Sequence, residues 1–369
     1  MNTFTMSNTA IPLSVCLVGP VPPPAGGMAN QTLQLAELLR AEGADVELVA
    51  VNAPYKPAVV GKLPVIRALF RLLPYLCWLY RAVGRSQVVH IMANSGWSWH
   101  LFAAPAIWIA KLRNKPVLLN YRGGHAEPFF NKQWRFIRPS ISRCDAIIVP
   151  SAFLQQLFSR YQLSAVVIPN ILDQRLFYPA AEEPKQPQII VTRNLEAIYD
   201  IATAIQAFAL IKQQLPEARL TIAGSGPQLA ALKQLCLQLN ISDAVHFAGR
   251  LNLTEIAGLY RSASLMLNSS LVDNSPNSVI EAMACKVAVV STDVGGLRNL
   301  VTDKTDALLV SPGNAEQMAT AALSLLTEPQ KRNAMLASAY QNSQRFHWPA
   351  VMAQLQQHYQ QLIAKHRRA

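Results

Sequence analysis

The chain has 369 residues, of which 51% are hydrophobic and only 15% are charged, and its mean hydropathy is +0.17. This composition excludes an intrinsically disordered chain, and the length predicts two domains of roughly 150–200 residues each. The formal net charge of +12 is concentrated in the first half, because residues 1–179 carry 17 lysines and arginines against 7 acidic residues, whereas residues 180–369 carry 16 against 14.

Short β-like runs alternate with helical stretches along the whole chain. In the first half a helix is predicted over 28–43, and strands are predicted over 13–20, 45–51, 88–92, 115–121, 146–151 and 166–170. The polar stretch 179–188 is the predicted linker. After it come a helix over 200–216 and strands over 189–195, 219–227, 244–250, 264–270 and 287–293. This pattern predicts two parallel α/β domains, and sheets of this kind bind ligands at the carboxyl ends of their strands.

The segment 63–83, LPVIRALFRLLPYLCWLYRAV, has the length of a membrane span but contains arginines that are costly inside a bilayer. At 100° per residue, Arg67, Arg71, Arg81 and Arg85 fall within about 40° of one line. We therefore expect a helix that lies on an anionic membrane surface through 63–85, broken or kinked at Pro74. The alternative is a helix packed on its domain with a solvated arginine edge.

Three glycine-rich loops follow predicted strands, where backbone N–H groups can face an anion. They are GGMAN with Gly26 and Gly27, GSGP with Gly224 and Gly226, and VGG at 294–296. None has the spacing of a dinucleotide-binding or P-loop motif, and each alone is also typical of a tight turn.

The sequence gives little support to a metal site or to a serine hydrolase site. The seven histidines show no H-x-x-x-H or H-E-x-x-H spacing, no D-x-D occurs, and no G-x-S-x-G elbow is present. We therefore expect no metal and no resident cofactor. The basic half favours phosphate-bearing substrates or anionic lipid over nucleic acid, because no basic motif is interleaved with aromatic residues.

The stretch DNSPNSVIEAMAC at 273–285 predicts a capped helix start. Ser275 suits the N-cap and Pro276 the first helical position, so the N–H groups of Asn277 and Ser278 are free to bind an anion. Two acids, Asp273 in the loop and Glu281 on the helix, flank this start. The pattern favours a ligand that carries both phosphates and hydroxyls, although an ordinary capped helix also fits it.

Asp273, seven residues and Glu281, followed by AMAC, resemble the acid–seven–acid motif of retaining glycosyltransferases of family 4. The resemblance covers nearly the whole chain, through GPVPPPAGGMANQTLQLAELL, VIPNILDQRLFYP, LTIAGSGP, VVSTDVGGLRNLV and the closing FHWPAVMAQLQQHY. It implies the GT-B fold, with two Rossmann-like doubly wound domains facing a cleft. The first domain (1–180, joined by a crossover helix at about 347–369) would bind the acceptor and the second (181–346) the nucleotide sugar.

The resemblance also implies residue roles. Glu281 would accept hydrogen bonds from the donor's ribose, Asp273 would hold a sugar hydroxyl, and the diphosphate would lie on N–H groups around Asn274, Ser275, Asn277 and Ser278. The leaving diphosphate would help deprotonate the acceptor, so no enzyme nucleophile is required.

Several positions depart from the family pattern. Asp273 replaces the usual first Glu, Asn194 stands where an Arg is usual and Tyr199 where a Lys is usual, so that Arg193 or Arg250 would have to hold the diphosphate. The family's histidine aligns with Arg122 rather than with His125. Either residue could serve, Arg122 as a fixed cation near the sugar or His125 as a hydrogen-bond partner. His125 is also consistent with a plain surface loop residue.

The sequence thus predicts a retaining, metal-independent glycosyltransferase that moves a sugar from a UDP- or GDP-linked donor to a lipid-linked or polysaccharide acceptor in cell-envelope biosynthesis. The five scattered cysteines and the absence of a basic region before the first apolar run predict a cytoplasmic protein without a secretory signal, peripheral on the inner membrane. The alternatives are a nucleotide-sugar epimerase or hydrolase of the same fold, or a non-catalytic GT-B binding subunit.

Overall fold

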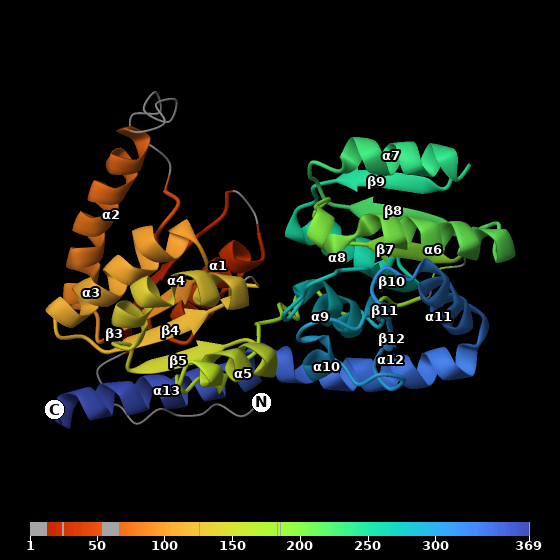
Figure 1. Cartoon of the computed structure of the whole chain (residues 1–369). Coiled ribbons are helices and arrows are strands. Elements are labelled where there is room, and N and C mark those ends of the chain that lie inside the picture. The colour runs from red at the N-terminus through yellow and green to blue at the C-terminus, as the bar shows by residue number, and fades with distance from the viewer. Residues whose placement is uncertain are drawn as a thin grey trace. The chain divides into compact units, whose positions relative to one another are not determined.

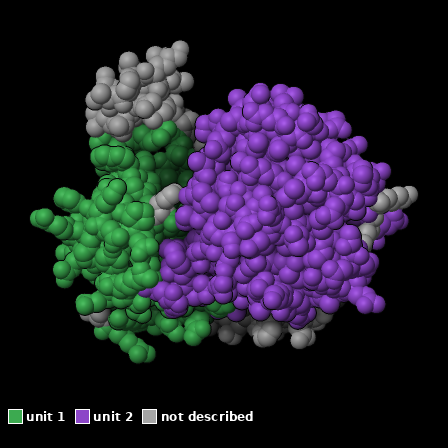
Figure 2. Space-filling view, turned by 45° about the vertical axis from the view of Figure 1, so that its right-hand side comes forward, with its two compact units in different colours: residues 1–149, 157–166, 354–369 green, residues 150–156, 167–353 purple. Residues whose placement is uncertain are grey.

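A computed structural model describes residues 13–23, 26–53, 66–124, 126–182, 184 and 186–368, with only the backbone described at 66–69. The chain forms two compact units, coloured separately in Figure 2. Unit 1 comprises Met1–Val149, Leu157–Val166 and Gln354–Ala369, and unit 2 comprises Pro150–Gln156 and Val167–Ala353.

Unit 1 is built on a sheet with the strand order β2-β1-β3-β4-β5-β6, in which β1 to β5 pair in parallel (Figure 1). The strands are β1 (Ser14–Gly19), β2 (Asp45–Ala50), β3 (Val88–Ala93), β4 (Val117–Tyr121), β5 (Ala146–Val149) and β6 (Val166–Val167). Every residue of β3 and β4 is buried, as expected for a parallel sheet covered on both faces.

The helices of unit 1 follow the predicted alternation. They are α1 (Gly27–Ala41), α2 (Ile66–Arg85), the π-helix η2 (Trp99–Ala103), α3 (Ala104–Leu112) and α4 (Ala126–Ile141). Helices α5 (Ala152–Arg160) and α13 (Trp348–Arg368) have residues in both units.

Helix α2 corrects one expectation. It is continuous from Ile66 to Arg85, so the helix is not broken at Pro74, and the alternative of a kink there stays a prediction. Pro74 is exposed, and the carbonyl of Phe70, which loses its helical partner, can be satisfied by water on that side. Within the residues that the structure describes, no helix combines the length and the apolar character needed to cross a bilayer.

Unit 2 repeats the architecture with the strand order β12-β11-β10-β7-β8-β9, in which all pairs are parallel (Figure 1). Its strands are β7 (Gln188–Val191), β8 (Arg219–Ala223), β9 (Val245–Gly249), β10 (Leu265–Asn268), β11 (Ala288–Thr292) and β12 (Leu308–Val310). The doubly wound α/β fold predicted from the sequence is confirmed for both units.

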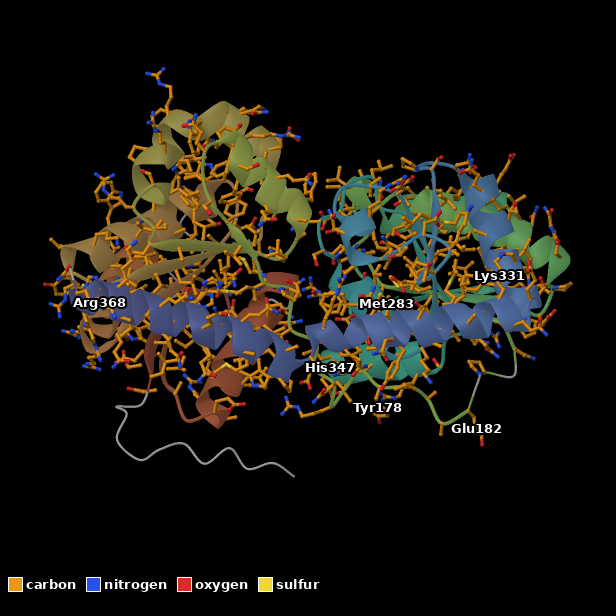
Figure 3. The ribbon with its side chains drawn as sticks, turned by 90° about the horizontal axis from the view of Figure 1, so that it is seen from below. Tyr178, Glu182, Met283, Lys331, His347 and Arg368 are labelled. Carbon is orange, nitrogen blue, oxygen red and sulfur yellow. The ribbon has the colours of Figure 1, made fainter. Side chains whose placement is uncertain are left out.

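The helices of unit 2 pack on both faces of its sheet. They are η3 (Ala197–Tyr199), α6 (Ile201–Gln214), α7 (Leu229–Gln238), α8 (Leu253–Arg261), α9 (Asn277–Ala284), α10 (Leu297–Leu300), α11 (Ala315–Thr327), α12 (Pro329–Ser343) and η4 (Gln344–Phe346). Figure 3 shows α12 running from Lys331 toward His347, just before α13 begins.

Neighbouring residues of β7 point into two different cores. Ile189 and Val191 pack with residues of α6, α7 and α11, while Ile190 packs with residues of α8 and α9 on the other face. Because strand side chains alternate between faces, a run of apolar residues is needed to fill both cores. This rigid sheet fixes the loops after β7 and β10, which are neighbouring strands, at one edge.

Candidate active site

The start of α9 lies at this carboxyl edge of unit 2, but one residue later than predicted. Pro276, rather than Ser275, holds the N-cap position, since its ψ of 118° is not helical and its carbonyl accepts from the N–H of Val279 at 3.2 Å. Proline fits there because the N-cap, like the first helical position, needs no intrahelical N–H donor. The predicted N-cap at Ser275 is wrong, and the N–H groups of Asn277 and Ser278 still open the helix.

Two side chains from distant parts of unit 2 hold the turn that precedes α9. Asn170 Nδ2 donates to the carbonyl of Ser275 at 3.0 Å and to Asn277 Oδ1 at 2.6 Å. Ser151 Oγ donates to Oδ1 of the buried Asn274. The positive end of α9 is therefore held in place before any ligand arrives.

Ser278 adds a polar atom that its surroundings leave unsatisfied. Ser278 is buried, and its Oγ has no hydrogen-bond partner among the described residues. Buried hydroxyls are usually paired, so an orphan at a helix N-terminus is consistent with a ligand contact there.

Arg193 is the cation that reaches this site. It follows β7, its Nη2 forms an ion pair with Asp273, and its Nε donates to Asn268 Oδ1 at 3.0 Å. Its guanidinium carbon lies 5.0 Å from the centre of the Tyr199 ring. Burial lowers the pKa of Arg193 from its usual value, while the nearby Tyr199, Tyr260 and Glu281 act in the opposite direction.

The two neighbouring candidates lie elsewhere. Asn194 is exposed and donates to Glu196 Oε1 at 3.1 Å. Arg250 is exposed just beyond β9, which is the edge strand two places from β7. The structure therefore brings Arg193, and neither Asn194 nor Arg250, to Asp273.

Glu281 lies on α9 in a polar cluster with Tyr260. Burial raises the pKa of Glu281 from 4.5 to about 7, and a hydrogen bond from Tyr260 and the charge of Arg193 limit this rise. The Tyr260 hydroxyl oxygen also lies 2.7 Å from Thr192 Oγ1 and 3.0 Å from the carbonyl oxygen of Ser278. Near neutral pH this carboxyl group can therefore either accept or donate a hydrogen bond.

Three glycines of unit 2 lie where the backbones of neighbouring loops are in close contact. A Cβ on Gly224 would lie 1.9 Å from the Arg193 carbonyl oxygen, and one on Gly226 would lie 2.3 Å from that of Leu195. A Cβ on Gly296 would likewise lie 1.9 Å from the Asn274 carbonyl oxygen. The glycines thus let the loops that carry Arg193 and Asn274 pack against their neighbours, and this packing accounts for them without a phosphate contact.

In unit 1 the predicted residues lie after β1 and β4. Gly26 is the N-cap of α1 and Gly27 its first residue, and both are exposed. Arg122 Nη2 donates to Gln31 Oε1 of α1 at 3.2 Å, and burial lowers the pKa of Arg122 to about 10. His125 lies outside the described residues.

No group of three His, Cys, Asp or Glu that could hold a metal ion occurs in the described part of the chain. The charges at the unit 2 site are instead the Arg193–Asp273 pair, Glu281 and the dipole of α9.

Two family models match the chain in succession. Residues 25–175 match the model described as Glycosyltransferase Family 4, and residues 174–342 match the model described as Glycosyl transferases group 1. The chain belongs to the group 1 glycosyltransferases. The second match contains Asp273, Glu281 and Arg193, and the first contains Arg122.

Among relatives of this glycosyltransferase, the phosphatidyl-myo-inositol mannosyltransferase of Mycolicibacterium smegmatis is 25% identical over 91% of this chain and 90% of its own. The alpha-monoglucosyldiacylglycerol synthase of Streptococcus pneumoniae is 26% identical over 54% of this chain, which spans about half of that relative's length. Anabaena HepE in complex with UDP-glucose has the same fold, with a TM-score of 0.75 and 19% identity, over 94% of this chain and all of that one.

Five side chains of the site have no counterpart among the residues predicted from the sequence. They are Ser151, Asn170, Thr192, Tyr260 and Asn268. Ser151 and Asn170 each end a predicted strand, 146–151 and 166–170, which is the local signal that could have indicated them. Asn268 ends β10 but lies inside the longer strand predicted over 264–270. Tyr260 lies within a helix and carries no such signal.

Proposed function

We propose that the chain is a retaining glycosyltransferase that moves a sugar from a nucleotide-sugar donor to a lipid-linked acceptor of the cell envelope. The observation that supports this most is the arrangement at the carboxyl edge of unit 2. There the open N-terminus of α9, the Arg193–Asp273 ion pair and Glu281 lie together.

Unit 2 is the proposed donor site. The N–H groups that open α9 and the Arg193 guanidinium would bind the diphosphate, since both are suited to phosphate oxygens. Glu281 would accept hydrogen bonds from ribose hydroxyls, and Asp273 would hold a hydroxyl of the transferred sugar. The UDP-glucose bound by HepE supports a UDP-linked donor, and a GDP-linked donor is the alternative.

Chemistry at this site would rely on orientation and charge. As the bond between the anomeric carbon and the diphosphate breaks, negative charge develops on the leaving oxygen, and Arg193 and the α9 dipole would stabilise it. That oxygen would take the proton of the acceptor hydroxyl, which attacks from the same face, so the anomeric configuration is kept. These fixed positive groups would make a metal unnecessary. By the resemblance, Arg122 of unit 1 would supply a further cation near the sugar.

A lipid acceptor is supported by the relatives and by unit 1. The names of two relatives given above contain a lipid: diacylglycerol in that of the synthase and phosphatidyl-myo-inositol in that of the mannosyltransferase. The outer face of α2 exposes Phe70, Leu73 and Tyr80 together with Arg81 and Arg85. Apolar rings beside arginines suit an anionic bilayer surface, so we propose that α2 binds the membrane peripherally.

The predicted arginine stripe of α2 is only partly correct. Arg81 and Arg85 are exposed as expected, but Arg71 is half-buried and lines a hollow in unit 1. The side chain of Arg67 lies outside the described residues.

A thermal-shift screen against nucleotides and nucleotide sugars, with EDTA present, tests the donor site. UDP or GDP ligands should raise the melting temperature, and Glu281→Ala should remove the shift and lower turnover more than about 100-fold. The exposed Glu217→Gln is the matched control and should behave as wild type. Near-normal turnover in Glu281→Ala would exclude this assignment.

The two alternatives give different products. An epimerase or hydrolase would convert the nucleotide sugar without an acceptor, and a binding subunit would bind it without turnover. Mass spectrometry of reactions with and without extracted lipid separates these cases, and the anomeric coupling in the product's NMR spectrum tests retention.

A further inference from the structure

Unit 1 contains a hollow of about 230 Å³ at the carboxyl ends of β1, β2 and β3. Its walls come from the strand ends, the first turn of α1, α2 and the π-helix η2. Most of the lining is aliphatic or aromatic, as in Val18, Met28, Val51, Ile91 and Phe102. A parallel α/β sheet binds its ligands at this end, so the position alone favours a substrate.

The walls are fixed by hydrogen bonds within unit 1. Asn52 exchanges hydrogen bonds with the backbone of Val21 at 2.9 and 2.6 Å and donates to the Pro23 carbonyl at 3.1 Å, which holds the loop after β1. The buried Tyr75 donates to the Phe102 carbonyl at 2.9 Å and packs edge-on against its ring. The hollow is therefore formed before a ligand enters, as binding pockets usually are.

Arg71 is the cation in this lining, and it lies one helical turn before Tyr75. A guanidinium beside apolar walls interacts with an anion more strongly than one in water does, because the surroundings screen it less. Its planar fork of donors also matches the oxygens of a phosphate. Apolar walls with an arginine thus suit a phosphate joined to a hydrocarbon or glycerol group.

The same turn of α2 points in two directions. Phe70 and Leu73 are exposed on its outer side, with 44% and 53% of their surface accessible, whereas Arg71 points to the hollow. Pockets for drug-sized ligands span about 300–1,000 Å³, so the hollow has room for a head group and a few carbons rather than a whole lipid. A lipid whose tail stays in the bilayer beside Phe70 and Leu73 could present its phosphate to Arg71.

We propose that this hollow binds the phosphate-bearing head of a lipid-anchored acceptor through Arg71. The proposal deepens the proposed function and rests on it, because it names the class of acceptor that the transferase uses.

Isothermal titration calorimetry of the full-length protein with three probes tests this proposal. The probes are farnesyl phosphate below its micelle concentration, farnesol and inorganic phosphate. Farnesyl phosphate should bind at least about tenfold more tightly than either of the others, since the other two lack the charge or the chain. Equal binding of farnesol and farnesyl phosphate would overturn the proposal. Inorganic phosphate binding as tightly as farnesyl phosphate would overturn it too, by making the site one for free anions.

Variants assign the effect to Arg71. Arg71→Gln should weaken farnesyl phosphate binding about tenfold, and Arg71→Lys should lose less because it keeps the charge. Ser98→Phe, at the residue before η2, fills the hollow and keeps the arginine, and it should abolish binding. Arg135→Gln, at an exposed site on α4, is the control and should stay within about twofold of wild type. Wild-type affinity in both Arg71→Gln and Ser98→Phe would refute the assignment.

A nucleotide arm keeps this test separate from that of the donor site. Each variant should retain the thermal shift with UDP or GDP, which also shows that it is folded. If the wild-type protein does not bind UDP or GDP, the proposed function is refuted, whether or not the protein binds farnesyl phosphate. Retained nucleotide binding without farnesyl phosphate binding would remove this inference alone.

Discussion

The carboxyl edges of the two sheets carry opposite kinds of surface on the same architecture. In unit 2 the edge is polar and largely pre-paired, with Arg193 bound to Asp273 and Asn170 bound to Asn277. In unit 1 the edge encloses an apolar hollow with Arg71 in its wall. The comparison shows that the carboxyl edge of a parallel α/β sheet can carry an ion-paired polar surface in one unit and an apolar hollow in the other, because the loops and helices that follow the strands differ.

Substitution of Arg193 removes the ion pair that distinguishes the edge of unit 2. Arg193→Gln leaves Asp273 without its partner and removes the proposed diphosphate contact, so kcat/KM for the donor should fall about 30-fold or more. Asn194→Ala, whose side chain contacts Glu196 instead, should lose less than about threefold. Steady-state kinetics with Arg219→Gln as an exposed control distinguishes the two. A larger loss at Asn194 would restore it as the diphosphate clamp.

The tight loop packing of unit 2 can be compared with the open loop of unit 1 through two glycines. Gly296→Ala places a Cβ against the Asn274 carbonyl and should cost roughly 2–4 kcal/mol in the free energy of unfolding and weaken nucleotide binding. Gly26→Ala meets nothing within 4 Å of its Cβ and only replaces the N-cap glycine of α1 by a poorer N-cap residue, so it should cost less than about 1 kcal/mol. Urea denaturation of both variants measures this. Equal stabilities would contradict the packing role.

The pH dependence of donor binding sharpens the role of Glu281. Its folded pKa of about 7 lies above its usual 4.5, so the carboxylate proposed to accept hydrogen bonds from the ribose hydroxyls forms only as pH rises through 7. Nucleotide affinity should therefore increase up to about pH 8 and fall about tenfold per pH unit well below 7. By the same raised pKa, Glu281 favours the folded state below pH 4.5 and loses that contribution as pH rises to 7.

Titration calorimetry with UDP between pH 5.5 and 8.5 checks this. Glu281→Gln, which cannot ionise, should retain only the titration of the nucleotide itself. A profile unchanged by the substitution would mean that Glu281 does not bind the donor as a carboxylate.

The smallest effect is expected at the outer face of α2 in unit 1. Replacing Arg81 and Arg85 by Gln should weaken binding to anionic vesicles about fivefold at low salt and hardly at all at high salt. Arg85 also pairs with Glu47 at 3.3 Å, so Arg81 should account for most of the loss. Leu73→Gln should weaken binding at both salt concentrations, because its contribution is apolar. Vesicle co-sedimentation measures all three, and unchanged binding would assign α2 to packing alone.

The sequence by itself determined the two α/β domains and the family, and it singled out Asp273 and Glu281 as candidate site residues. Strand and helix periods are local, so the alternation that begins at β1 and again at β7 can be seen without tertiary contacts. The start of α9 was predicted to within one residue from Pro276 and its polar neighbours.

Only the tertiary structure decided which side chains meet. Arg193 and Asp273 are 80 positions apart in the chain, and Asn170 and Asn277 are 107 apart. The order of strands brings Arg193, after β7, and Asp273, after β10, to one edge, and no local pattern encodes that order. The same holds for Arg71, whose helical position could not reveal that it lines a hollow rather than the solvent-facing stripe. Local sequence fixes what each segment becomes, while packing between segments fixes what each side chain can reach.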